Sequence, residues 1–272
     1  MKIAISFILL LIGALYGCTP KKETDTQENT YLHQQEQQQG YPVLIATPQS
    51  ASYGLPFCEK QYCIDVEIFS FKSEDTWFNQ LVDQKIADLI RQQLGIAQKL
   101  SLQVAVNEFV KRSDQWQETQ EHQPWSVYIQ PRVVAQQGEI TVTQIQTEYK
   151  LGDQIIPQQF YYFVVDRKNQ HVFKLYDMVE QDKRVEFGLY IQQEYEKWRE
   201  TQENKQQLKP QIYWANQDWF FDDQGIGIYY QSQQLALDTE SIVNNNFTIY
   251  LDIAHLKRFI NKQYLIKLGF LN

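Results

Sequence analysis

The amino-acid sequence predicts an α+β fold that consists mainly of antiparallel sheet. Stretches with the period-2 alternation of half-buried strands follow one another across short polar turns, which is typical of antiparallel hairpins. The helical stretches are not interleaved one per strand: two lie in the N-terminal half, and one long one precedes a C-terminal hairpin region. This order favours α+β over a doubly wound parallel sheet.

The first strand and the two helices after it follow from the spacing of apolar residues. Residues 64–68 alternate between apolar and acidic side chains, which predicts a half-buried strand. A cap at Ser73 or Asp75 begins a helix whose apolar residues recur every three or four positions and which ends at Gly95. A second helix with one apolar face begins at Ser101.

The middle of the chain is rich in β-branched and aromatic residues, which predicts strands. The richest stretches are 125–129, 139–149 and 159–165. The polar run 166–170 then precedes the apolar stretch 171–176, as in a β-hairpin.

The C-terminal part is predicted to contain a long amphipathic helix over 183–204 followed by short strands. Gly225 closes the turn sequence DDQG, and we expect it to adopt the positive φ that a tight hairpin needs. The remaining elements are strands at 212–214, 219–221, 226–230 and 246–253 and a short helix at 254–261.

The start of the chain has the features of a bacterial secretion signal. Lys2 precedes an apolar run of about fourteen residues, which is too short to span a bilayer. The run ends in LYGC at Cys18, and this ending resembles the lipobox of lipoproteins, in which the cysteine is acylated and becomes the mature N-terminus. The alternative is an ordinary signal peptide with an incidental cysteine. We therefore expect a lipoprotein signal peptide at 1–17 and a membrane anchor through lipid on Cys18.

The residues behind the anchor predict a tether and a folded body. Residues 18–40 are polar and rich in glutamine, so they cannot offset the entropy of ordering and are expected to be disordered. The body divides into an N-terminal α+β half at 41–150 and a C-terminal half at 151–272, with one compact unit as the alternative. Thr19 rather than aspartate follows the anchor, which implies an outer-membrane lipoprotein facing the periplasm if the source has two membranes.

Two further cysteines, Cys58 and Cys63, lie in the segment FCEKQYC. An even number of cysteines in an oxidising compartment predicts one disulfide that closes a small loop. The alternatives are free thiols or half of a metal site. No second cysteine pair accompanies them, and the four histidines are scattered along the chain.

Charge and motifs exclude several classes of function. The net charge is -8, and no basic patch is present that could displace counterions from phosphates, so no nucleic-acid partner is expected. The sequence contains none of the common nucleophile, zinc, phosphate-loop or calcium-loop motifs. Asp222 and Asp223 are adjacent carboxylates, but neighbours in a strand point to opposite sides and those in a turn are solvated. We expect no catalytic residue, no metal and no cofactor, and hence a protein that is not an enzyme.

Segments of the C-terminal half resemble those of a known family. They are WFFDDQGIGIYY at 219–230, QLA at 234–236 and FTIYLD at 247–252, with FKLYDM at 173–178 upstream. These segments are similar to a domain of unknown function found in the extracellular region of the lysozyme-sensing anti-sigma-V factor and beside some peptidoglycan deacetylase domains. The strand and helix at 62–97 resemble the domain that usually precedes it. Family members carry a Gly-Gly-Ala-His-Gly type of loop, whereas YKLGDQIIP at 149–157 keeps one glycine and lacks the histidine.

The resemblance implies binding or sensing in the cell envelope. In the relative that senses lysozyme, this region binds that cationic enzyme, and an acidic domain suits a basic protein such as lysozyme, or peptidoglycan. The alternatives are a structural or assembly lipoprotein without a soluble ligand and a peptidoglycan-modifying enzyme. Taken singly, each aromatic residue of the region is better explained as core, and most of them are expected to be core. The expected binding surface comprises Trp214, Trp219, Asp222, Asp223, Tyr229 and Tyr230.

Overall fold

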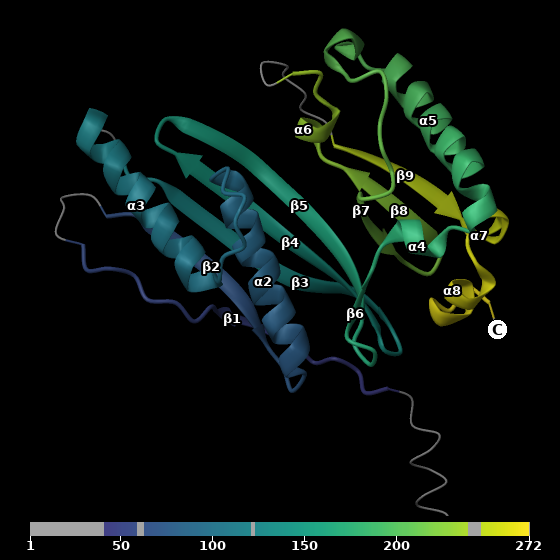
Figure 1. Ribbon diagram of the computed structural model, residues 1–272, viewed down its shortest axis with the longest axis horizontal. Helices are drawn as coiled ribbons and strands as arrows, with labels where there is room; N and C mark the ends of the chain where they lie inside the picture. Colours follow the sequence, from purple (N-terminus) through teal and green to yellow (C-terminus); the bar gives the residue numbers. More distant parts are fainter. Residues whose placement is uncertain (1–40, 59–62, 121–122, 239–245, 272) are drawn as a thin grey trace, which may run out of the picture. The chain divides into compact units, whose positions relative to one another are not determined.

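The computed structural model describes residues 41–58, 63–120, 123–238 and 246–271. The predicted signal peptide, Cys18 and the predicted tether lie outside the described residues. The chain from Tyr41 onward is one compact unit with a six-stranded and a three-stranded sheet (Figure 1). The predicted α+β class is confirmed. Within the described ranges, no helix has both the length and the apolar character that crossing a membrane requires.

The six-stranded sheet is antiparallel except at one pair of strands. Only β2 and β3 run parallel, and parallel neighbours need a long crossover connection. Helices α2 (Thr76–Gln93) and α3 (Leu102–Gln120) supply that crossover and cover one face of the sheet (Figure 1). The strands follow their order in the chain: β1 (Thr47–Ser50), β2 (Asp65–Lys72), β3 (Ser126–Gln137), β4 (Ile140–Leu151), β5 (Gln154–Asp166) and β6 (His171–Phe173).

Helix α2 begins and ends where the sequence predicts. The side chain of Asp75 accepts the backbone N–H of Phe78 at 2.9 Å and caps the start of α2. Gly95 follows the helix with φ at +66°, a conformation that glycine adopts without strain. The core between helices and sheet includes Ile68, Phe78, Ile86, Phe109, Ile129 and Ile145.

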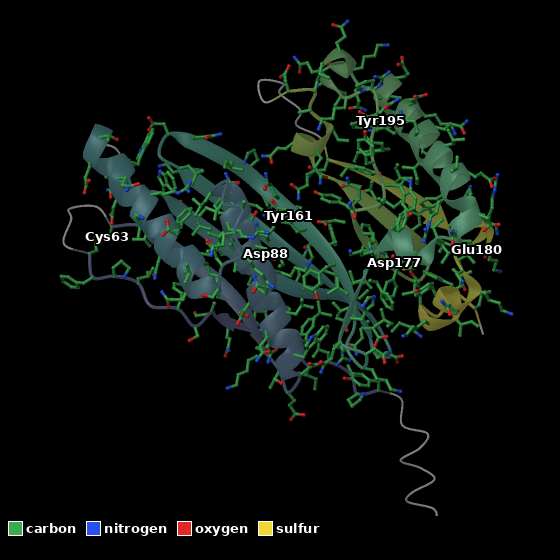
Figure 2. The ribbon with its side chains drawn as sticks, in the orientation of Figure 1. Cys63, Asp88, Tyr161, Asp177, Glu180 and Tyr195 are labelled. Carbon is green, nitrogen blue, oxygen red and sulfur yellow. A yellow bond between two sulfur atoms is a disulfide. The ribbon has the colours of Figure 1, made fainter. Side chains whose placement is uncertain are left out.

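The C-terminal part builds a second core around the three-stranded sheet. Helix α5 (Arg184–Glu200) lies along this sheet, and its fully buried Tyr195 donates its hydroxyl to the carbonyl of Lys209 at 2.7 Å (Figures 1 and 2). The strands are β7 (Asp218–Phe221), β8 (Gly225–Tyr230) and β9 (Phe247–Asp252), and the shorter helices are α4 (Leu175–Met178), α6 (Ser232–Leu235), α7 (Ile253–Phe259) and α8 (Lys262–Lys267).

Strands β4 and β5 contribute to both hydrophobic cores. Ile145 and Phe163 face α2 and α3, whereas Ile140, Val142 and Val164 face the second core. The hairpin that these strands form crosses residue 150, where the sequence places a boundary between two halves. The two cores are therefore built on one shared hairpin.

Three expectations from the sequence differ from the structure. Residues 212–214 form no strand, because the amide of Gln192 accepts the N–H of Ile212 at 3.1 Å and donates to the carbonyl of Pro210 at 2.9 Å, in place of a neighbouring strand. The stretch 171–176 is divided, since β6 ends at Phe173 and α4 begins two residues later.

Gly225 is the third difference. Its φ is not among the positive values, so turn conformation does not explain the glycine. A Cβ atom at this position would lie 2.1 Å from the carbonyl oxygen of Leu251 on β9. The glycine is therefore required by the close approach of two backbones.

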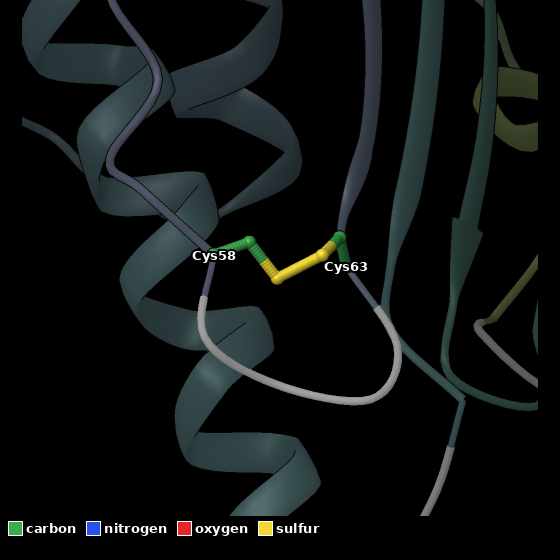
Figure 3. Close-up of a disulfide and its surroundings, with 2 residues drawn as sticks. All are labelled: Cys58 and Cys63. Atoms are coloured by element: carbon green, nitrogen blue, oxygen red, sulfur yellow. A yellow bond between two sulfur atoms is a disulfide. The ribbon is translucent and has the colours of Figure 1, made fainter.

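The predicted disulfide between Cys58 and Cys63 is confirmed (Figure 3). The two Cα atoms lie 5.9 Å apart, and the bond closes a small loop that ends two residues before β2. Free thiols and a metal site at this position are both excluded by the bond.

Arg167 fastens the first described residues to the sheet. Its buried guanidinium donates to the carbonyl of Pro42 at 2.8 Å and to the hydroxyl of Thr141 at 3.0 Å. The same group lies 3.6 Å from the carboxylate of Asp75 and 4.7 Å from the ring centre of Tyr41. The side chain of Arg167 thus connects Tyr41 and Pro42 to β4 and to the start of α2.

Candidate functional site

The face of the six-stranded sheet opposite α2 and α3 contains a pocket of about 420 Å³. The alternation of strand side chains creates it: Val127 and Tyr149 point to the helices, so their strand neighbours Ser126, Tyr128, Glu148 and Lys150 point to the other face. We call this cavity the open-face pocket. Its lining side chains on that face come from β2, β3, β4 and β5, and they are Asp65, Glu67, Ser126, Tyr128, Glu148, Lys150, Ile155 and Gln158.

The strand register places Tyr128 between two carboxylates. Glu67 on β2 is paired with Tyr128 on β3, and Tyr128 is paired with Glu148 on β4. Neighbouring strands lie about 4.8 Å apart, so the backbones that carry the two glutamates are roughly 10 Å apart across the ring. Both glutamates are exposed, and the tyrosine is partly exposed.

The tyrosine ring is held in place by two contacts within the sheet. The hydroxyl of Tyr128 donates to the side-chain oxygen of Gln130 at 2.9 Å. Phe69 packs edge-on against the ring, with a distance of 6.0 Å between the ring centres. The hydroxyl is thus engaged within the protein, and the pocket side of the residue is chiefly the aromatic ring.

Glu148 is also oriented by its neighbours. Its carboxylate accepts the side-chain amides of Gln146 at 3.1 Å and Gln158 at 3.0 Å. The amides come from the same strand and from the adjacent β5. This arrangement can bind a positively charged group without moving its acceptor oxygens far.

A polar ladder continues along the open face toward the second core. The guanidinium of Arg132 donates to Gln144 at 2.6 Å, and the amide of Gln144 donates to the hydroxyl of Tyr162. The ring of Tyr162 packs against Phe220 and Tyr229, with ring centres 5.0 and 5.1 Å away. The open face thereby ends against the three-stranded sheet.

Asp218 on β7 connects the two sheets at this point. Its carboxylate accepts the backbone N–H of Tyr162 at 2.9 Å, and Gln231 donates to the neighbouring carbonyl of Phe160 at 3.1 Å. These side chains satisfy two groups at the edge of β5 beyond the reach of β6. Burial raises the pKa of Asp218 to about 6, even though the N–H of Tyr162 and the charge of Lys85 oppose the shift.

Three of the six residues predicted to form a binding surface lie in the core. Trp219 is 2% exposed, Tyr229 6% and Tyr230 1%. β8 is the central strand of its sheet and all of its residues are buried, so both tyrosines are covered. The indole N–H of Trp219 donates to the carbonyl of Phe173 at 3.2 Å. The prediction that these three residues form a contact surface is wrong.

The two predicted carboxylates lie in the exposed turn between β7 and β8. Asp222 accepts the backbone N–H groups of Gln224 at 2.9 Å and Gly225 at 3.0 Å, and it also accepts the hydroxyl of Tyr250. Partial burial would raise the pKa of Asp222, but these hydrogen bonds outweigh it and hold the pKa below its usual range. Asp222 therefore stabilises the turn, and Asp223 beside it is exposed.

Trp214, the last of the six, is partly buried and packs against α5. Its ring stacks on Tyr176 and meets Phe187, with centres 5.6 and 4.7 Å apart. It also covers Gly188, where a Cβ atom would lie 3.1 Å from the indole nitrogen. The predicted residues therefore do not assemble into one surface.

Sequence reasoning missed the open-face pocket. Its signal was present in the polar positions of the strands, since Asp65 and Glu67 alternate with the apolar residues that predicted β2. The same alternation places Tyr128 and Glu148 on the polar faces of β3 and β4. If the strand residues that point away from the helices had been grouped by face, the sequence would have indicated an acidic surface with an aromatic residue.

The carboxylates, side-chain amides and aromatic ring of this site are groups that bind a ligand rather than groups that catalyse a reaction. Among the described residues, no group of three or more histidine, cysteine or acidic side chains is placed to hold a metal ion. The open-face pocket offers acceptor oxygens beside an aromatic surface, which suits a cationic ligand.

Comparison with known proteins identifies structural relatives only. No family model matches the chain, and no curated protein matches it. A DUF3298 family protein from Pseudomonas aeruginosa superposes with a TM-score of 0.57 at 14% identity, covering 82% of this chain and 96% of that one. A DUF3298 family member from Bacteroides fragilis gives 0.53 at 13% identity, covering 83% and 95%. The chain therefore has a fold similar to that of DUF3298 proteins, a domain of unknown function.

Proposed function

We propose that this protein is a lipid-anchored binding module of the cell envelope that recognises a basic protein, such as lysozyme, through the open-face pocket. The observation that carries the proposal is the lining of that pocket. Three carboxylates and one ammonium group leave it with a net charge of −2 around a partly exposed tyrosine. Such a surface attracts a cationic partner and repels an acidic one.

The charge of the whole chain supports the same partner. The formal net charge is -8, so a basic protein is attracted before contact is made. Asp65, Glu67 and Glu148 are exposed, so their interactions are screened by salt. Binding through this face is therefore expected to weaken as ionic strength rises.

The start of the sequence supports placement in the envelope. The lipobox-like ending at Cys18 provides the anchor, and a following Thr19 implies the outer membrane, facing the periplasm, in a bacterium with two membranes. The disulfide between Cys58 and Cys63 is compatible with an oxidising compartment.

Peptidoglycan is the second candidate ligand. Amide side chains recur on this face of the sheet, where the partly exposed Gln130 and Gln146 are paired on adjacent strands. Amides both donate and accept hydrogen bonds, so they suit the hydroxyl and acetamido groups of a glycan.

The proposal is tested by binding of purified residues 41–272, which form one compact unit, to lysozyme in a titration calorimeter. We expect binding that weakens about tenfold or more between about 50 and about 500 mM salt. The double variant Glu67→Gln/Glu148→Gln should lose most of the affinity. The matched control Glu203→Gln/Asp177→Asn changes two exposed carboxylates elsewhere and should bind as the parent does.

Unchanged affinity of the pocket variant would place the contact on another face. Absence of lysozyme binding at low salt would reject a lysozyme-like partner. Sedimentation with purified peptidoglycan then tests the second candidate, for which Gln130→Ala/Gln146→Ala should lower the bound fraction.

A further inference from the structure

We infer that the open-face pocket receives a single arginine side chain of its partner, stacked on Tyr128 between Glu67 and Glu148. This inference rests on the proposed function, because it assigns the chemistry by which a basic partner is held. The cavity, the ring and the register of three strands together carry it.

The ring provides a surface for a flat cation. Tyr128 is partly exposed in the pocket, and its hydroxyl is already donated to Gln130. A cation over an aromatic face is attracted to the ring, and the planar guanidinium of arginine also stacks on it. The contact with Phe69 fixes the ring, so little order is lost when a ligand binds.

The carboxylates on each side match the two ends of a guanidinium. Their backbones lie two strand spacings apart, roughly 10 Å, which leaves room between them for one planar group with N–H···O bonds of about 2.8 Å on each side. Glu148 is held by Gln146 and Gln158, so one acceptor is already oriented. Lysine has a single ammonium group and cannot present a planar fork to both glutamates at once.

Lys150 is the one cationic side chain among the residues that line the pocket. Lys150 lies two residues from Glu148 on β4 and in the same cross-strand row as Asp65 and Ser126. Asp65 lies across Ser126 from the lysine, and the three carboxylates against one ammonium group leave the lining with a net charge of −2, so the lysine lowers but does not remove the attraction of the Glu67–Tyr128–Glu148 row for a cation.

The test uses fluorescein-labelled hexa-arginine, hexa-lysine and hexa-citrulline peptides, titrated by anisotropy against residues 41–272 at low salt. Citrulline has the shape of arginine without its charge. We expect hexa-arginine to bind about tenfold more tightly than hexa-citrulline and about threefold more tightly than hexa-lysine.

Substitutions separate the ring from the hydroxyl. Tyr128→Phe should keep the affinity for hexa-arginine within about twofold, whereas Tyr128→Leu should weaken it about fivefold or more. Glu67→Gln and Glu148→Gln should each remove most of the preference for arginine over citrulline. Tyr213→Leu alters an 80% exposed tyrosine elsewhere and should change nothing. Far-ultraviolet circular dichroism and thermal melting verify that each variant is folded.

The outcomes distinguish this inference from the proposed function. Lysozyme binding that depends on Glu67 and Glu148 but not on the Tyr128 ring, together with equal affinity for arginine and lysine peptides, would overturn the arginine site and leave the proposed function in place. Selective arginine binding without lysozyme binding would support the site and reject that partner. If the protein bound neither lysozyme nor the arginine peptide selectively, the proposed function and the arginine site would both be overturned.

Discussion

The buried charge of Asp218 lowers the stability of the folded state at neutral pH. Its carboxylate is enclosed at the junction of the two sheets, and burial raises its pKa to about 6. Because the folded pKa lies above the unfolded value of 3.8, the folded state binds the proton more tightly than the unfolded chain does. Stability should therefore increase as the pH falls through 6 toward 4.

We predict that Asp218→Asn stabilises the protein at neutral pH. The amide can still accept the N–H of Tyr162, and the cost of the buried charge, up to about 3 kcal/mol for a shift of about two pKa units, is removed. Urea unfolding between pH 5 and pH 8 measures the effect, and the variant should also lose the pH dependence that the parent shows around pH 6.

Asp223→Asn is the matched control, because it removes one carboxylate from an exposed turn and should leave the unfolding curves almost unchanged. A less stable Asp218→Asn variant at pH 8 would show that the charged hydrogen bond to Tyr162 outweighs the cost of burial.

At the scale of single elements, β8 depends on its glycines. Gly225 lies so close to β9 that a Cβ atom would lie 2.1 Å from the carbonyl oxygen of Leu251. We predict that Gly225→Ala separates the two strands and lowers the free energy of unfolding by about 3 kcal/mol. Thermal melting measures the loss. Gln224→Ala changes an exposed residue in the same turn and should leave the melting temperature almost unchanged. A Gly225→Ala variant that melts at the same temperature as the parent would contradict this prediction.

The elements could be predicted from the sequence where one face of each is apolar. Period-2 alternation identified β2, and helical spacing with a cap at Asp75 and a terminal glycine identified α2. β1 was missed because its residues, TPQS, are all exposed and have no apolar face. The stretch 212–214 was misread as a strand because its apolar residues cover α5 instead.

The site required the order of strands as well as their pattern. Glu67 and Glu148 are far apart in sequence, and they flank Tyr128 only because β3 lies between β2 and β4. That order depends on the crossover through α2 and α3, which no single strand reveals. Conversely, aromatic residues such as Trp219 and Tyr230 gave a strong signal in the sequence because they fill the core.

For the whole molecule, the shared hairpin predicts cooperative unfolding. β4 and β5 contribute side chains to both cores, so neither core can lose its packing without affecting the other. We expect a single urea transition in which tryptophan fluorescence and far-ultraviolet circular dichroism coincide. Tryptophans are present in both parts, for example Trp125 and Trp219, so fluorescence reports on each.

Replacement of Trp198, Trp214 and Trp219 by phenylalanine removes the tryptophans that pack in the second core, so the remaining fluorescence reports on the first core, and this variant provides the control. If this variant and the parent gave different midpoints by fluorescence but the same midpoint by circular dichroism, the two cores would unfold separately. The division of the body at residue 150 would then describe two domains.

The hydrogen bond from Arg167 to the carbonyl of Pro42 determines which elements bear a force applied at the N-terminal end of the described residues. A pull on the chain at Tyr41 reaches the guanidinium before it reaches β1, because the clamped carbonyl precedes that strand. The load is then divided between β4, through Thr141, and α2, through Asp75. The hydrogen bonds of the edge strand β1 would therefore not be the first to carry a force applied at Tyr41.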